Sequence, residues 1–244
     1  MAPHPWADLA PEHFRLLRLA ALPVDRASGA RPLRFVQLGR VVRHSKALSL
    51  LRLSVQLPAQ RLRKEQNLLE VWIDHQRKEV RFGPDKGLST EPGNRGLGRF
   101  LLAQGAAWAL QHCAHYQVEG AALPGRDALG EDDRLRRDHC LQAQGFVVEY
   151  LDPLQLKARY GAARVAELSE RWNTEKVQIV DILDSAAMLQ QADQSLREQN
   201  AKVRKLSERI DQLRREDGSL RFSITCLLAF CLFQAGLLIW MATR

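Results

Sequence analysis

The sequence predicts an α/β protein with a mixed, mainly antiparallel sheet flanked by helices, followed by a long coiled-coil helix and one transmembrane helix. Three observations favour this fold class. Short stretches between residues 34 and 82 alternate apolar and polar side chains with a period of two, which is typical of neighbouring antiparallel strands. Residues 182–213 repeat apolar side chains every seven positions, as coiled coils do. Residues 222–241 carry no charged side chain.

The first elements are predicted from these local periods. Pro11 to Leu22 mixes leucines with basic residues and predicts a short amphipathic helix, which ends at the break VDRASGARP. Strands are then expected at 34–42, 51–57, 69–74 and 79–82, where apolar positions alternate with polar ones. Their close spacing predicts an antiparallel meander.

A glycine-rich turn separates the meander from the first long helix. Residues 91–110 read EPGNRGLGRFLLAQGAAWAL, in which glycines lie directly before apolar residues at helical spacing. A strand YQVEGAAL, a second helix EDDRLRRDHCLQAQ and a strand FVVEY are expected to follow. The second helix begins with acidic residues and carries basic residues later, as the helix dipole favours.

The heptad region predicts a coiled-coil stalk. Apolar residues at 182, 189, 196, 203 and 210 form one seam position, and Ala192, Leu206 and Leu213 lie three residues further on. In a parallel homodimer Arg209 and Arg214 would face each other, so the seam pairs with a different chain, pairs weakly or adopts another geometry. A long amphipathic helix that folds back on its own domain is the alternative. We therefore expect a homo- or hetero-oligomer.

The apolar segment Phe222 to Met241 predicts a membrane anchor near the end of the chain. Its 20 residues would span about 30 Å as a helix, the thickness of a bilayer core, and Trp240 lies near one end, where interfacial aromatic residues are favoured. Basic residues at 214, 215 and 221 precede it, which predicts a single-pass protein of the inner (cell) membrane with its N-terminal domain in the cytoplasm. An organelle membrane is the alternative. The amino terminus lacks the features of a signal peptide.

The charge and the cysteines narrow the choice of partners. Residues 172–221 contain nine Lys/Arg and nine Asp/Glu, so the net charge of +8 lies almost wholly in residues 1–171. Such a basic domain suits nucleic acid, an anionic lipid surface or an anionic cofactor. We recognise no nucleic-acid-binding motif and expect no specific nucleic-acid partner. Four cysteines without disulfide-framework spacing fit a reducing compartment.

The glycine turn suggests chemistry. Backbone N–H groups at the start of a helix can approach a phosphate where glycines remove side-chain obstruction. Residues 93–98 read GNRGLG and are followed by RFLL, and the second helix runs into Gly145-Phe146. Between Leu48 and Tyr150 this pattern resembles the GNAT superfamily of N-acetyltransferases, whose loop reads Q/R-x-x-G-x-G/A.

The resemblance implies a GNAT-like domain that uses acetyl-CoA as its co-substrate. In the family the loop binds the pyrophosphate and the pantetheine lies between two splayed strands. The implied cofactor-binding residues are Gly93, Asn94, Arg95, Gly96, Leu97, Gly98 and Arg99. The implied domains are a GNAT-like domain at 1–160, a linker at 161–172, the stalk at 173–218 and the transmembrane helix at 222–241.

The sequence departs from the family at two positions. Gly93 replaces the usual Gln or Arg, and Leu141 occupies the position where the family often has a tyrosine that protonates the leaving thiolate. Candidate bases for the acceptor amine are Glu79 and Glu70, with Asp74 beside them. Strand alternation also explains these acids as solvated side chains.

Two other kinds of site fit the sequence less well. His112, Cys113, His115, His139 and Cys140 could in principle bind zinc, but no C-x-x-C or H-x-x-x-H pair is present, and no metal is expected. No Ser-His-Asp set is evident from the order of residues. The sequence thus predicts a membrane-anchored N-acetyltransferase acting on an unidentified amine. The alternative is an inactive GNAT-fold scaffold or sensor that assembles partners through its coiled coil.

Overall fold

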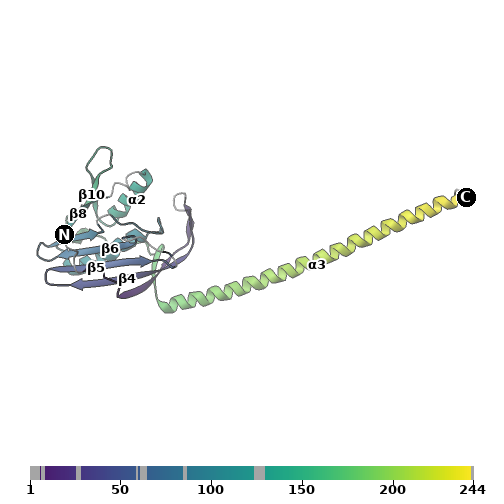
Figure 1. Ribbon diagram of the computed structural model, residues 1–244, viewed down its shortest axis with the longest axis horizontal. Coiled ribbons are helices and arrows are strands. Elements are labelled where there is room, and N and C mark those ends of the chain that lie inside the picture. The colour runs from purple at the N-terminus through teal and green to yellow at the C-terminus, as the bar shows by residue number, and fades with distance from the viewer. Residues whose placement is uncertain are drawn as a thin grey trace. The chain divides into compact units, whose positions relative to one another are not determined.

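The computed structural model describes residues 6, 9–25, 29–58, 60, 65–84, 87–123 and 130–242. The chain divides into two compact units, Met1–Ile182 and Leu183–Arg244. The first unit contains the sheet and the second is helical (Figure 1).

A nine-stranded sheet forms the first unit, in the order β11-β1-β4-β5-β6-β7-β8-β10-β9. Every neighbouring pair is antiparallel except β7 and β8, which run parallel. A separate two-stranded hairpin pairs β2 with β3. The strands are β1 (His13–Leu19), β2 (Leu22–Asp25), β3 (Gly29–Arg31), β4 (Arg34–His44), β5 (Leu48–Gln56), β6 (Leu68–Asp74), β7 (Glu79–Gly83), β8 (Gln117–Ala122), β9 (Val147–Tyr150), β10 (Ala158–Ala162) and β11 (Val177–Val180).

Two helices and a short 3-10 turn complete this unit. They are α1 (Leu97–Cys113), α2 (Glu131–Gln142) and η2 (Val165–Glu167). The predicted order of meander, glycine loop, helix, strand, helix and strand is confirmed. Gly145, with φ of 88°, ends the turn after α2, and Phe146 then leads into β9.

The core lies between the sheet and α1. Leu51, Leu53 and Val55 of β5 are buried on the same face as the alternate residues of β6, because side chains in a strand point to one face at every second position. Helix α1 packs on β5 and β6 through an apolar stripe. A side chain at Gly105 would place its Cβ 2.8 Å from Leu69, so the glycine allows this close approach.

The predicted helix at 11–22 is wrong. Its residues form β1, in which Leu17 and Leu19 are fully buried and the intervening Arg18 is only half-buried. This strand lies between β4 and β11. The mixture of leucines and basic residues resembles that of an amphipathic helix. Pairing with two strands that are distant in the sequence nevertheless decides the conformation of the segment.

The sheet unit also extends beyond the expected boundary at residue 160. Residues 161–172, expected to form a linker, contain the end of β10 and η2, and β11 follows at the start of the expected stalk. Strand β11 pairs with β1, from Leu16↔Val180 to Leu19↔Val177. Strands β10 and β11 are only five and four residues long and were not recognised from the sequence, so only the pairing reveals them.

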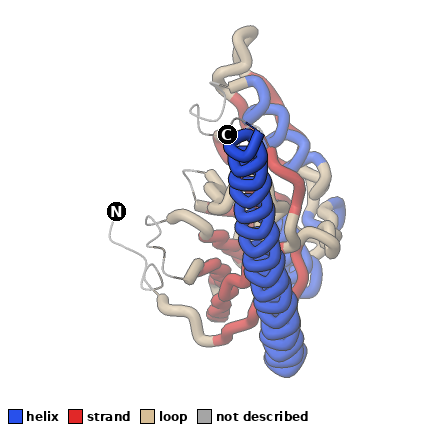
Figure 2. Tube along the Cα trace, turned by 90° about the vertical axis from the view of Figure 1, so that its right-hand side faces the viewer, coloured by secondary structure: helices blue, strands red, loops and turns tan. Residues whose placement is uncertain are grey.

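The described residues of the second unit belong to one unbroken helix, α3 (Ile182–Ala242), which can be followed in Figure 2. Its seam residues are exposed, among them Leu196, Val203 and Ile210. The coiled coil stays a prediction. The helix includes an 18-residue window of mean hydropathy 2.2, long and apolar enough to span a membrane. All described residues of the buried core belong to the first unit.

Candidate functional site

The glycine loop connects β7 to the N-terminus of α1. Gly96 immediately precedes the helix with φ of 80° and ψ of 5°, a left-handed conformation that favours glycine, and its carbonyl accepts the Phe100 N–H at 3.0 Å. Among the described residues, no side-chain hydrogen bond caps this helix, and its first turn contains no acidic residue. The first N–H groups of α1 are therefore suited to an anionic group.

Arg95 lies inside the domain. Its side chain is almost fully buried, and Nη2 donates to the carbonyl oxygens of Leu19, Ala20 and Pro32 at 3.2, 2.7 and 2.8 Å. Burial, together with the nearby charges of Arg34 and Arg31, lowers the pKa of Arg95. The guanidinium thus fastens the loop to the end of β1 and to the chain after β3.

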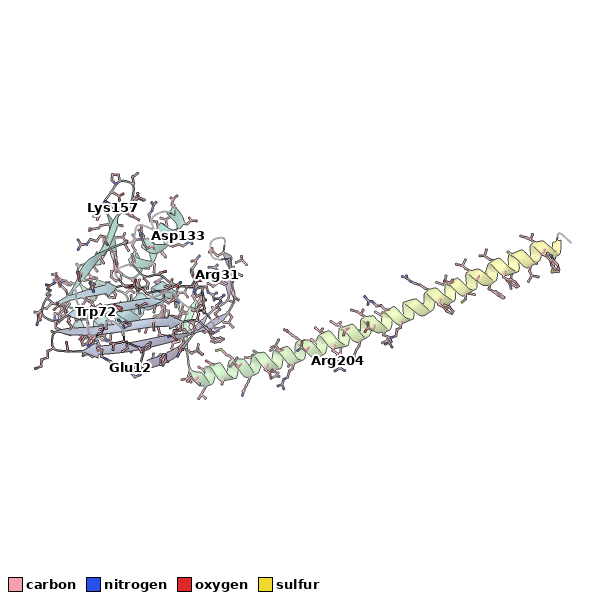
Figure 3. All side chains as sticks on the ribbon, viewed as in Figure 1. Glu12, Arg31, Trp72, Asp133, Lys157 and Arg204 are labelled. Carbon is pink, nitrogen blue, oxygen red and sulfur yellow. The ribbon has the colours of Figure 1, made fainter. Side chains whose placement is uncertain are left out.

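Basic side chains surround the loop. Arg31 donates to the Asn94 carbonyl at 3.2 Å, and Asn94 Nδ2 donates to an Asp25 carboxylate oxygen at 3.0 Å. Arg31 ends β3 and is labelled in Figure 3. A Cβ at Gly96 would lie 3.5 Å from Lys176, so this lysine passes beside the helix start. The hairpin β2–β3 and the chain before β11 therefore supply positive charge that the sequence alone did not assign to the loop.

The remaining loop residues differ in how open they are. A side chain at Gly93 would meet no atom of the described residues within 4 Å, whereas one at Gly98 would touch Leu88, Thr90 and Cys140. Leu97 is buried in the core. Arg99 is half-buried, and its Nε atom has no hydrogen-bond partner among the described residues.

The two parallel strands beside the loop pair only briefly. The ladder between β7 and β8 consists of Glu79↔Gln117 and Val80↔Val118, although both strands continue further. Beyond it, the Tyr160 hydroxyl of β10 donates to the Phe82 carbonyl of β7 at 2.8 Å. The strands thus separate in the half of β7 that leads towards the glycine loop.

Aromatic rings pack where the strands part. The Phe82 and Phe146 ring centroids are 5.2 Å apart, and those of Phe146 and Tyr160 are 5.5 Å apart, both in edge-on contacts. Tyr160 was not among the residues proposed from sequence. A lone tyrosine in a short strand gives no local signal, and only the sheet order brings it near β7.

The two candidate bases occupy different surroundings. Glu70 is ion-paired with Arg52, with 2.7 Å between its Oε1 atom and Arg52 Nη2, and it also accepts a hydrogen bond from Trp72 Nε1 at 3.1 Å. Glu79 begins β7, where the neighbouring Lys78 carbonyl accepts the Gln117 N–H. Because Gln117 soon follows the end of α1, Glu79 lies towards the C-terminal end of that helix, and the glycine loop lies at the other end. The structure does not bring the loop and Glu79 together.

The position of the missing tyrosine is apolar. Leu141 is buried in the core. Burial raises the pKa of the adjacent Cys140 thiol to about 11, with the Arg99 charge opposing that shift. Cys140 is therefore a protonated thiol near neutral pH and is a poor nucleophile.

A hydrogen-bonded cluster of His44, Ser49 and His75 lies beside the C-terminal end of α1. Ser49 Oγ lies 3.0 Å from His44 Nδ1 and 2.8 Å from His75 Nε2, and it is buried. The His112 ring stacks on His44 at 5.4 Å, and Cys113 is buried with its thiol directed at a backbone carbonyl. In the part of the chain that the structure describes, no three His, Cys, Asp or Glu side chains are grouped to hold a metal ion.

Comparison with known proteins gives no relative. No protein family, curated protein or solved structure matches this chain. The geometry of the loop, the separated strands and the surrounding charge is therefore what bears on function.

Proposed function

We propose that the sheet unit is a GNAT-like N-acetyltransferase that transfers an acetyl group from acetyl-CoA to an amine. The observation that carries the proposal is the unit β7–glycine loop–α1–β8, in which the parallel ladder ends after two residue pairs. A helix N-terminus without a side-chain cap then lies next to a pair of separating strands. This is the arrangement that the resemblance implies for the pyrophosphate and the pantetheine.

The loop residues would share the binding of the cofactor. The N–H groups of Leu97, Gly98 and Arg99 would donate to the pyrophosphate, and Arg31 and Lys176 would add positive charge. Gly93 leaves open space on the loop for the approach of the ligand. In this role Arg95 positions the loop through its three carbonyl contacts and does not touch the cofactor.

The transfer requires a polarised thioester and two proton steps. A strand backbone N–H would polarise the acetyl carbonyl, the amine nitrogen would bond to the carbonyl carbon, and the carbon–sulfur bond would break. The amine proton leaves to a base, and the departing thiolate takes a proton. Of the two acids predicted from the sequence, Glu70 is the candidate base, because it pairs with Gly83 at the end of β7 that leads to the glycine loop, whereas Glu79 lies at the other end of that strand. The Tyr160 hydroxyl is the candidate donor, because it lies where β7 and β8 part, whereas Leu141 has no proton to give.

A second function, an inactive scaffold or sensor, is favoured by one specific observation. The carboxylate of Glu70 is already occupied by Arg52 and Trp72. If Glu70 stabilises the domain through this ion pair and takes no part in catalysis, the domain would keep the GNAT-like fold and act by assembling partners. In either case we propose that residues 222–241 anchor the protein in the inner (cell) membrane, with the sheet unit in the cytoplasm. The exposed seam of α3 would then form a coiled coil.

Calorimetric titration of acetyl-CoA into a fragment of residues 1–182 tests the proposal. The fragment ends at residue 182 because β11 completes the sheet. We expect binding that the substitution Arg99→Glu weakens about tenfold or more, since it places a negative charge at the helix N-terminus. The matched control is Arg77→Glu in the exposed turn between β6 and β7, which should bind normally. Absence of binding by the folded fragment would refute the cofactor assignment.

A measurement of turnover distinguishes the transferase from the inactive scaffold or sensor. Release of the free CoA thiol is followed with a panel of amines as acceptors. Binding with amine-dependent thiol release supports the transferase. Binding without release for any amine supports the scaffold or sensor.

A further inference from the structure

A cavity lies on the other side of α1 from the separated strands. It has a volume of about 510 Å³ and is formed between α1 and the face of β1, β4 and β5. Pockets of roughly 300–1,000 Å³ are the usual size for small-molecule sites. The cavity shares no residue with the glycine loop, so a ligand bound in it would be independent of the proposed transferase site.

The floor of this groove is apolar, and one wall is uncharged. Leu38, Leu51 and Leu53 lie on the strands beneath it. The wall is a stripe of α1 in which Gln104, Ala107, Trp108 and Gln111 follow at helical spacing. The glutamines are neutral, so neither the floor nor this wall carries charge.

The opposite wall is positively charged. Arg15 on β1 pairs with Leu38, and Arg40 on β4 pairs with His13, so the register places both arginines on the same face as the buried Leu38. Both are exposed and line the groove, and no carboxylate is bonded to either among the described residues. The same register makes the two arginines diagonal neighbours across the β1–β4 pair, so their side chains lie near each other. Partial burial lowers the pKa of Arg40, and the nearby charge of Arg15 lowers it further.

The acid at the rim is already paired. Glu12 also lines the cavity, and both of its carboxylate oxygens accept hydrogen bonds from Arg43. Figure 3 shows Glu12 beside the edge of the sheet. Two guanidinium groups thus remain with unneutralised charge next to an apolar floor.

The groove is open because β11 covers only part of β1. Their pairing runs from Leu16 to Leu19, so no strand pairs with His13, Phe14 and Arg15 on that edge in the described structure. Phe14 is 53% exposed there. A ligand can therefore enter beside the first half of β1.

We propose that this groove binds a fatty carboxylate, with the carboxylate held by Arg15 and Arg40 and the acyl chain lying over the leucine floor against Trp108. Paired guanidinium groups match the oxygens of a carboxylate, and charge-assisted hydrogen bonds of this kind are stronger than neutral ones. The apolar floor stabilises the chain by removing it from water. The groove places positive charge next to an apolar surface, and a fatty carboxylate carries its negative charge next to an apolar chain.

The test is calorimetric titration of decanoate into the 1–182 fragment, which holds the whole described core. Decanol and acetate are titrated separately, because each supplies only half of the proposed chemistry. We expect decanoate to bind more than tenfold tighter than either. The double substitution Arg15→Gln/Arg40→Gln should weaken decanoate at least tenfold and leave decanol unchanged.

A double control removes the same charge elsewhere. Arg77→Gln/Arg159→Gln changes two exposed arginines outside the groove, and decanoate binding should be unaffected. Equal losses in both double variants, or equal binding of decanol and decanoate, would overturn the proposal. The proposal would also be overturned if the fragment did not bind decanoate but sedimented with anionic phospholipid vesicles in a way that required Arg15 and Arg40. The two arginines would then contact a membrane surface. Retained acetyl-CoA binding in the groove variant would distinguish this result from failure of the proposed transferase site.

Discussion

The ion pair between Arg52 on β5 and Glu70 on β6 offers the sharpest test of what a candidate catalytic acid does. Arg52 Nε and Nη2 lie 2.8 and 2.7 Å from Glu70 Oε1, and the two side chains are only 8% and 17% exposed. Arg52 also donates to the carbonyls of Trp6 and Leu9. The pair therefore ties the N-terminal segment to two central strands.

Replacing Glu70 by Ala would leave the Arg52 charge buried without its carboxylate. Removing one partner of a buried pair costs about 3–5 kcal/mol. Because Arg52 keeps its two carbonyl acceptors, we expect the lower end, about 3 kcal/mol. For a domain of this size that corresponds to a fall in Tm of roughly 6–12 °C.

Thermal and urea unfolding of the 1–182 fragment measure this effect. Glu119→Ala, an exposed acid on β8, is the matched control and should change the free energy of unfolding by about 0.5 kcal/mol or less. The double variant with Arg52→Ala should show a coupling energy of about 1–3 kcal/mol. A Glu70→Ala variant as stable as the control would refute a structural role. If acetyl transfer fell at the same time, Glu70 would be the catalytic base.

Three further predictions concern the loop, the thiols and the stalk. Gly96→Ala should destabilise the fragment by roughly 1–2 kcal/mol in urea unfolding, because its φ is 80°, whereas Gly93→Ala should be nearly neutral; equal effects would contradict the loop geometry. Burial raises the pKa of both Cys113 and Cys140 to about 11, above an unfolded value of about 8.5. The contribution of these two thiols to the free energy of unfolding is therefore complete below about pH 8.5 and is lost as the pH rises towards 11. If a double variant with both cysteines changed to Ala lost stability between about pH 8.5 and 11 as steeply as the unchanged fragment, this expectation would be refuted. Val203→Asp should weaken self- or partner association of the full chain about tenfold in sedimentation, and unchanged association would exclude this seam.

Much of the fold could be predicted because its signals are local. The alternation of Leu51, Leu53 and Val55 follows from the geometry of a strand with one buried face, and it holds in the structure. The glycine loop, α1, α2 and the Gly145 turn also appear where the sequence predicts them. In each case neighbouring residues carry enough information to favour one conformation.

The failures involve partners far apart in the sequence. Residues 13–19 form a strand because β4 and β11 lie on either side of it, and β11 begins more than 150 residues later. The direction in which Arg95 points depends on the carbonyls of Leu19, Ala20 and Pro32, which no spacing rule links to the loop. A basic residue in a glycine loop predicts an anion contact only when its side chain faces solvent.

By itself the sequence determined most helices and strands, the uneven distribution of charge and the long apolar helix. These features can be predicted because each follows from the periodicity or composition of one continuous segment. Tertiary structure decided the rest. Sheet order and register placed Tyr160 beside Phe82 and put Arg15 and Arg40 on one face of a groove. These contacts depend on hydrogen bonds between strands distant along the chain, and the energy of such pairing is not encoded in any single segment.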